Sequence, residues 1–317
     1  LVQDARRHGV RVLPIDATVS GWDCTIEGAQ QPVPGVAQPQ PAVRLGLRLV
    51  VGMGRPAVLR LLQARGVAGL AAASDVNALD ALAVWSDPGT RPFGSTEDLS
   101  LRARLEPADL QAPAAADALR ALSGHRRQQV WDAAAQLRAP PLLRDAPVDE
   151  PALALPEAPE GEEILFDYAS TGFTLRRHPL ALLRPRLERW KLSSALQLQA
   201  TPHGRRVRAC GIVTVRQRPG SANGTMFVSL EDETGPVNVI VWPALVDTWR
   251  VPLLRSRLLA VEGIWQCSVP PRSRGEGEEG GEGAPTAVRH LIAQRFKDLT
   301  PWLGRLGGAL DGSRDFH

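Results

Sequence analysis

The stretch from Arg205 to Leu299 constrains the fold of this 317-residue chain more than any other. Apolar and polar residues alternate along residues 207–213 and again around Val237 and Val239, and glycine-rich or charged segments separate these runs. Alternation with a period of two is typical of half-buried β-strands, and glycine and charge between the runs are typical of turns. The stretch is therefore predicted to be a domain of short β-strands.

Two more runs, Arg257–Gln266 and Val288–Arg295, complete five strands if the first run is bent at Gly211. An apolar, helix-like segment, Ala244–Leu254, separates the third strand from the fourth. Five strands with a helix in that place follow the order of an OB-fold, a small barrel that often binds single-stranded nucleic acid. The sequence therefore predicts an OB-fold over residues 205–299.

A glycine–hydrophobic–glycine turn, Gly52-Met53-Gly54, precedes a predicted helix from about Pro56 to Arg65. Such a turn at a helix N-terminus points backbone N–H groups at a phosphate. We therefore expect Gly52, Gly54 and Arg55 to contact a nucleic-acid backbone. A purely structural turn is the alternative, and a dinucleotide site is a further one, although the βαβ unit that it needs does not follow.

Charge is unevenly distributed, although the formal net charge is only +3. Residues 145–167 contain eight acidic residues and no basic one, whereas residues 176–218 contain eleven basic residues and a single acid, Glu188. A basic segment of this density predicts a surface that meets phosphate, and a merely solvated surface is the alternative.

Composition narrows the class of protein further. The chain is 44% apolar and 22% charged, which is usual for a globular protein, and it contains no apolar run of about 18 residues that could cross a membrane. Its three cysteines and six histidines are scattered without the paired spacing of a zinc site, which favours a reducing cytoplasm and no structural metal. The start at a leucine within a helix-like segment favours a piece of a longer protein without a signal peptide.

Short segments in colinear order over nearly the whole chain resemble C-family bacterial DNA polymerases, and those of the barrel and the C-terminus resemble the error-prone, lesion-bypass branch. They are Arg6–Val10, Trp22–Thr25, Val43–Gly54, Thr171–Leu180, Gly211–Gly220, Leu230–Gly235, Asn238–Pro243 and Ser313–His317. The resemblance implies the C-terminal portion of a polymerase, with an α+β fold in which a helix-hairpin-helix region precedes the OB-fold barrel.

The resemblance also implies a division of the chain into six regions. These are residues 1–42, the end of a fingers-like region; 43–139, the helix-hairpin-helix region; 140–163, an acidic, proline-rich linker expected to be extended; 164–204, a helical connector; 205–299, the OB-fold; and 300–317, a C-terminal tail. The segments 66–91 and 268–285 are longer than the family pattern.

The family's catalytic carboxylates lie in a palm domain upstream of Leu1, so no catalytic or metal-binding residue is assigned and this fragment is predicted to be inactive. The whole enzyme would perform nucleotidyl transfer with two Mg²⁺ ions, and no cofactor is expected in this part. The implied partners are single-stranded template and primer–template duplex. A second hypothesis is a protein-interaction module, in which the acidic linker and the tail Leu299–His317 would recruit a sliding clamp or accessory bypass proteins. The peptide Glu163–Phe166 distantly resembles a clamp-binding motif, although the expected glutamine is missing.

Within the barrel, Arg208, Arg216 and Arg218 are the candidates for phosphate contacts, and Phe227 or Trp242 for base stacking. The alternative for both aromatic residues is a place in the barrel core. Two other functions remain open at this stage, which are a fragment of a replicative C-family polymerase α subunit and a stand-alone OB protein that binds single-stranded nucleic acid.

Overall fold

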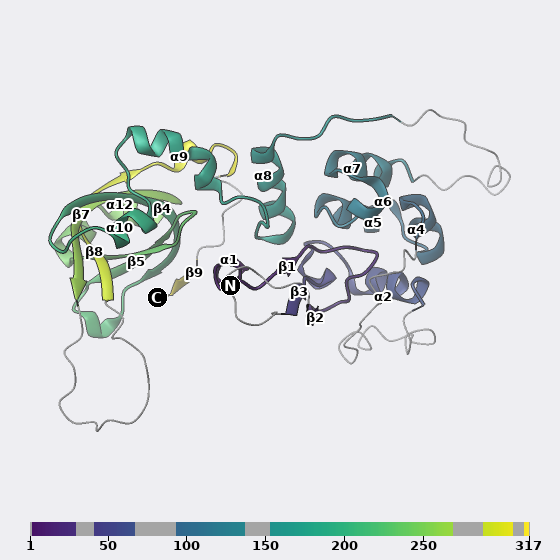
Figure 1. Cartoon of the computed structure of the whole chain (residues 1–317), viewed down its shortest axis with the longest axis horizontal. Helices are drawn as coiled ribbons and strands as arrows, with labels where there is room; N and C mark the ends of the chain where they lie inside the picture. The colour runs from purple at the N-terminus through teal and green to yellow at the C-terminus, as the bar shows by residue number, and fades with distance from the viewer. Residues whose placement is uncertain are drawn as a thin grey trace, which may run out of the picture. The chain divides into compact units, whose positions relative to one another are not determined.

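The computed structural model describes residues 2–29, 41–66, 93–136, 153–268, 288–306 and 314–316 (Figure 1). The chain forms two compact units, Leu1–Arg176 and Arg177–His317, each of which is described by itself. Most of the two long segments at 66–91 and 268–285 lies outside the described residues, as does the first part of the expected linker.

The first unit begins with helix α1 (Val2–Arg7) and a small sheet. The strands are β1 (Val12–Leu13), β2 (Thr25–Ala29) and β3 (Pro41–Arg44). The central strand, β3, pairs in parallel with β1 and antiparallel with β2.

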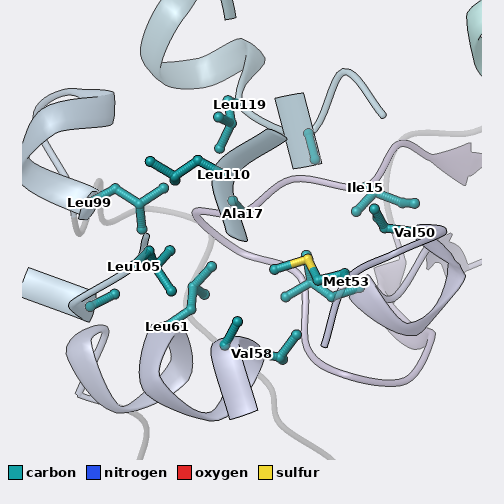
Figure 2. Close-up of a cluster of buried hydrophobic side chains, with 14 of the residues drawn as sticks. Ile15, Ala17, Val50, Met53, Val58, Leu61, Leu99, Leu105, Leu110 and Leu119 are labelled. Atoms are coloured by element: carbon teal, nitrogen blue, oxygen red, sulfur yellow. The ribbon is translucent and has the colours of Figure 1, made fainter. Parts of the chain in front are cut away.

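Short helices make up the rest of this unit. They are the 3₁₀ turn η1 (Leu47–Leu49), α2 (Arg55–Ala64), α4 (Thr96–Ala103), α5 (Pro107–Ala115), α6 (Arg120–Ser123), α7 (Arg126–Ala134) and α8 (Glu160–Thr171). Ser95 caps α4, because its hydroxyl accepts a hydrogen bond from the N–H of Asp98. The helices share one apolar core with the loop after β1, and Figure 2 shows side chains from α2, α4 and α5 converging there with Ile15 and Ala17.

Helix α8 begins earlier than the sequence predicts. Residues 160–163 were expected to belong to an extended linker, yet they form the first turn of the helix. Acidic side chains at Glu160, Glu162 and Glu163 favour this start because they complement the positive end of the helix dipole. Since Ile164 is completely buried, the peptide Glu163–Phe166 is a packed helical turn.

The second unit is a barrel with helices α9 (Pro179–Arg189) and α10 (Ala195–Gln199) before it. Its strands are β4 (Arg206–Gln217), β5 (Met226–Glu231), β6 (Pro236–Val241), β7 (Leu258–Ser268) and β8 (Val288–Asp298), and the strand β9 (Arg314–Phe316) adds to β4 in parallel. The short helices α11 (Pro243–Thr248) and α12 (Arg250–Arg255) lie between β6 and β7, while the 3₁₀ turns η3 (Gly220–Ala222) and η4 (Thr300–Leu303) follow β4 and β8.

The strand order β5–β6–β8–β7–β4 is closed by pairing of β4 with β5, and β6 and β8 run parallel. This arrangement confirms the predicted OB-fold. The helix predicted over residues 244–254 is instead two helices, which meet at Trp249.

Two glycines allow the barrel to close. At Gly263, next to a bulge in the pairing of β7 with β8, an added Cβ would lie 2.0 Å from the carbonyl oxygen of Ile292. At Gly211 an added Cβ would lie 2.7 Å from the Cβ of Leu230. The bend expected at Gly211 is thus a close strand contact, and the bulge in β4 comes later, between Val213 and Val215.

Candidate nucleic-acid interface

The turn between η1 and α2 exposes two glycines and buries the residue between them. Gly52 has a φ of +83°, which side-chain-bearing residues rarely adopt, and Gly54 is the extended N-cap of α2. Met53 is buried in the core of the first unit, as Figure 2 shows. The turn is therefore anchored by one side chain while the backbone on either side of it faces outward.

The N-terminus of α2 suits an anion. Among the described residues, no hydrogen-bond partner is found for the amides of Gly52 or Gly54. The guanidinium of Arg55, the first residue of α2, lies over the ring of Trp22 at 5.3 Å from its centroid. Two backbone donors, the positive end of a ten-residue helix and an oriented arginine thus come together in four consecutive residues.

The outer surface of β5 and β6 carries exposed aromatic residues. The side chains of Phe227 and Trp242 are 38% and 51% exposed, so neither belongs to the barrel core. Phe227 on β5 lies opposite Ile240 on β6, and Trp242 follows β6 directly. These side chains therefore lie on the strands that usually carry the ligand face of an OB-fold.

Arg218 lies beside this aromatic surface. It is exposed, at the start of the turn between β4 and β5. A Cβ added at Gly224 would lie 3.2 Å from Nη2 of Arg218 and 3.6 Å from Cγ of Pro243, the residue after Trp242. The structure thus places Arg218 and Pro243 on either side of Gly224, and Pro243 directly follows Trp242 in the chain. We call Arg218, Phe227 and Trp242 the β5–β6 face.

Arg216 is placed differently from its expected role. Its side chain is only 7% exposed, its Nε donates a hydrogen bond of 2.7 Å to the carbonyl oxygen of Leu253, and its Nη2 donates to that of Ser256. These carbonyls lie at the C-terminal end of α12, where a cation is favourable. The bulge between Val213 and Val215 turns Arg216 inward, so the expectation that it faces phosphate is corrected.

Arg208 is exposed but lies on another part of the barrel. It belongs to the half of β4 that pairs with β7, where its Nε is 3.7 Å from a carboxylate oxygen of Glu262. The structure therefore separates it from the β5–β6 face, whose Arg218 follows the other end of β4.

Asp232, which the sequence analysis did not single out, holds the turn between β5 and β6. Its Oδ1 accepts hydrogen bonds from the N–H groups of Thr234 and Gly235 at 2.7 and 3.0 Å, and its Oδ2 accepts one from Ala195 in α10 at 2.7 Å. The signal was present in Asp-Glu-Thr-Gly, since an aspartate followed by such residues is typical of a side-chain-stabilised turn. Arg184 from α9 pairs with the same carboxylate.

An ion-pair network occupies the first unit. Arg176, at the start of the basic stretch, has Nη2 at 2.9 Å from Asp117 and at 2.8 Å from Glu163, and Nη1 at 2.9 Å from Asp167. Buried Arg126 pairs with Glu163 and Asp167 as well. Burial raises the pKa of Glu163 above its ordinary value, and the two arginines oppose this rise. Arg176 is thus engaged with carboxylates within its own unit.

The described residues show no arrangement of a metal centre. In the ranges that the structure describes, no three His, Cys, Asp or Glu side chains are placed to hold a metal ion. Burial raises the pKa of the Cys210 thiol to about 12, so it stays protonated at neutral pH. None of the described helices is long and apolar enough to cross a membrane.

Comparison with known proteins finds a matching motif family and similar relatives. A helix-hairpin-helix motif family matches residues 9–75, which include the glycine turn and α2. The chain is 45% identical over 323 residues to the error-prone DNA polymerase of Ralstonia pickettii and 43% identical over 318 residues to that of Alkalilimnicola ehrlichii. Each match covers 100% of this chain and 26% of the relative.

Two solved structures are similar to about a third of the chain. Asparaginyl-tRNA synthetase from Pyrococcus horikoshii matches with a TM-score of 0.22 and 21% identity, over 31% of this chain and 20% of the synthetase. An OBody bound to hen egg-white lysozyme matches with a TM-score of 0.22 and 18% identity, over 31% of this chain and 82% of the OBody. Similarities of this size support no conclusion about function.

The similarity to error-prone DNA polymerases extends over all of this chain and over about a quarter of the relatives' own length. The helix-hairpin-helix match and the closed five-stranded barrel agree with the arrangement that the resemblance implies. The resemblance to error-prone DNA polymerases that the sequence indicates is therefore confirmed, and the chain spans about a quarter of the length of these relatives.

Proposed function

We propose that this chain is the C-terminal, DNA-holding portion of an error-prone DNA polymerase and is inactive by itself. The whole protein would extend a primer on damaged template by nucleotidyl transfer in the cytoplasm, with two Mg²⁺ ions held by carboxylates of a palm domain outside this chain. The main support is the placement of exposed Phe227, Trp242 and Arg218 on one face of an OB barrel, in a chain whose relatives are DNA polymerases.

The glycine turn would hold the sugar–phosphate backbone of the primer–template duplex. The outward amides of Gly52 and Gly54 and the guanidinium of Arg55 can donate to phosphate oxygens at the N-terminus of α2. Contacts of this kind position DNA without distinguishing its sequence. This property suits an enzyme that must accept any template.

The β5–β6 face would hold the single-stranded template. Phe227 and Trp242 offer ring surfaces for base stacking, which is worth about 1–3 kcal/mol per base, and Arg218 offers a phosphate contact beside them. Stacking tolerates every base, damaged ones included, because each presents a flat aromatic face. Contacts with a sliding clamp or bypass factors stay a prediction for the tail, since the peptide 163–166 is packed in α8.

The barrel proposal is tested with Phe227→Ala and Trp242→Ala and a labelled oligo(dT) strand. Each change should cost about 1–3 kcal/mol of binding free energy, roughly five- to 150-fold in Kd. Trp131→Ala is the matched control, because Trp131 is also 51% exposed but lies on α7 of the first unit. Equal affinities for the Trp242 and Trp131 variants would remove the β5–β6 face from the site.

The hairpin proposal is tested with Gly54→Glu and duplex DNA. A side chain fits at Gly54, since its Cβ would meet only Cδ of Pro56 at 3.7 Å, but its charge would repel phosphate by about 1 kcal/mol, roughly fivefold in Kd. Gly28→Glu adds the same charge on β2, where nothing lies within 4 Å of the new Cβ. Duplex affinity that falls equally in both variants would point to net charge alone and count against the turn.

A further inference from the structure

A basic groove lies on the outer surface of the barrel, between side chains of β4, β7 and β8. Arg208, Glu262, Arg295 and Lys297 line it together with Trp190, which follows α9, and it has a volume of about 180 Å³. We call it the β4–β7–β8 groove. It uses different strands from the β5–β6 face, whose residues lie on β5, after β6 and in the turn after β4.

Cations repeat along both outer strands of this groove. Arg206 and Arg208 are exposed two residues apart on β4, and Arg295 and Lys297 are exposed two residues apart on β8. Residues two apart on a strand lie about 6.7 Å from each other, and strands separated by one neighbour lie about 10 Å apart. The four cations thus form two parallel rows on either side of β7, a spacing that suits the repeating charge of a phosphodiester chain.

One acid lies between the two rows. Glu262 on β7 stands opposite Arg208 on one side and Arg295 on the other, and it forms ion pairs with Arg206 and Arg208. Among the described residues that line the groove it is the sole acid, and it faces three lining cations, Arg208, Arg295 and Lys297, with Arg206 beside them on β4. The excess of positive charge favours a polyanionic occupant.

Aromatic side chains form part of the groove wall. Trp190 is 38% exposed, and Nζ of Lys297 lies 4.2 Å from its ring centroid. The ring of Trp302 packs edge-on against that of Trp190, with 5.0 Å between the ring centroids. The guanidinium carbon of Arg186 lies 3.8 Å from the centroid of the Trp302 ring. Aromatic rings interleaved with cations are the combination that holds bases and phosphates of a single strand.

We propose that the β4–β7–β8 groove is a second contact site for single-stranded nucleic acid, separate from the β5–β6 face. The inference rests on the proposed function, because it assigns a further surface to the same ligand class. An acidic peptide could also meet the cations, but two rows with a regular repeat and a tryptophan wall favour a strand of nucleotides.

The first test removes two cations from the β8 row of the full 317-residue chain. Arg295→Gln with Lys297→Gln should weaken binding of an oligo(dT) of about 30 nucleotides, longer than the roughly 4–16 that one OB-fold covers. The expected loss is about tenfold in Kd, with a salt dependence reduced by about 1.4, or 0.7 for each lost phosphate contact. The control, Arg250→Gln with Arg255→Gln, removes two exposed arginines from the ends of α12 and should change neither quantity by as much.

The second test is expected to strengthen oligo(dT) binding instead of weakening it. Glu262→Gln removes the negative charge between the rows and frees Arg206 and Arg208 from their ion pair, so it should tighten binding by about threefold or more. A purely structural ion pair predicts lower barrel stability without tighter binding. Unchanged or weaker affinity of a folded Glu262→Gln chain would overturn the proposal.

The outcomes separate this inference from the proposed function. If the Arg295/Lys297 variant binds oligo(dT) normally while Trp242→Ala binds poorly, the second site is wrong and the β5–β6 face stands. If neither the Arg295/Lys297 variant nor Trp242→Ala changes the oligo(dT) affinity, both proposals fail. If the Arg295/Lys297 variant keeps oligo(dT) binding but loses binding to polyglutamate, the groove takes acidic peptides and the nucleic-acid inference is overturned.

Discussion

At the scale of single residues, Arg216 near the end of β4 and Arg218 in the turn that follows it show how two arginines two positions apart acquire different tasks. Arg216 points inward and donates to the carbonyls of Leu253 and Ser256, whereas Arg218 is exposed beside Pro243. A buried guanidinium leaves no donors for a ligand when backbone oxygens use them. The first arginine supports the barrel and the second is available to a phosphate.

This difference predicts separate effects of two matched substitutions. Arg216→Gln should lower the free energy of unfolding by about 1–3 kcal/mol for each carbonyl that loses its partner, and leave the oligo(dT) affinity of the folded chain intact. Arg218→Gln should leave the free energy of unfolding unchanged and weaken the oligo(dT) affinity. Urea unfolding and fluorescence anisotropy measure the two quantities, and a stable Arg216→Gln chain with weakened affinity would contradict the structural role.

At the scale of elements, the glycines at strand contacts decide whether the barrel closes. Gly263 has no room for a methyl group, since the carbonyl oxygen of Ile292 on β8 would lie 2.0 Å from it. Gly235, in the turn after β5, would place a methyl group at an ordinary 3.6 Å from the Cβ of Ala195. The same substitution thus has different consequences at the two sites.

We therefore expect Gly263→Ala to destabilise the second unit by about 1–3 kcal/mol or more, because β7 and β8 must separate to admit the methyl group. Gly235→Ala should have a much smaller effect. Thermal unfolding followed by circular dichroism compares them, and equal melting temperatures would show that the barrel adjusts at Gly263 without cost.

The order of the elements could be predicted from the sequence, but their local irregularities could not. Alternation and turn residues were sufficient for the five strands, and the helix-like segment between the third and fourth strands occupied the expected place. The bulge after Val213 depends on how β4 fits β5, a non-local contact that no periodicity records. That single shift turns Arg216 into the barrel, although the sequence predicts that it lies on the outside.

The candidate site was predictable to a similar degree. The glycine turn is local, so Gly52, Gly54 and Arg55 were identified together. The barrel residues were proposed as one set, whereas the structure divides them, because β4 is long and Arg208 lies in its first half, while Arg218 follows its other end. Distances between strand ends follow from the closed barrel and not from spacing in the sequence.

At the scale of the whole molecule, the chain consists of two units with separate cores. The core around α2, α4 and α5 belongs to residues up to Arg176, and the barrel core belongs to residues after it. Arg176 itself pairs with Asp117, Glu163 and Asp167, all within the first unit. Each unit is of a size that can fold independently.

Fragments 1–176 and 177–317 should therefore each fold on their own and unfold cooperatively. The second fragment should keep the oligo(dT) affinity of the full chain, and the first should keep duplex affinity that depends on Gly54. Separate expression and calorimetry test this expectation. A fragment 177–317 that is unfolded, or folded without affinity for oligo(dT), would contradict it.

The outer side of β5 and β6 offers two positions for protein engineering, Ser229 and Asn238, whose side chains are joined by a hydrogen bond of 3.2 Å. Both are small, neutral residues on the same surface as Phe227, so lysine could replace either one without disturbing what lies inside the barrel. Processivity, the number of nucleotides added before release, is the quantity that such added charge would be designed to raise. Arg216 offers no such freedom, because its side chain already supports the barrel from within.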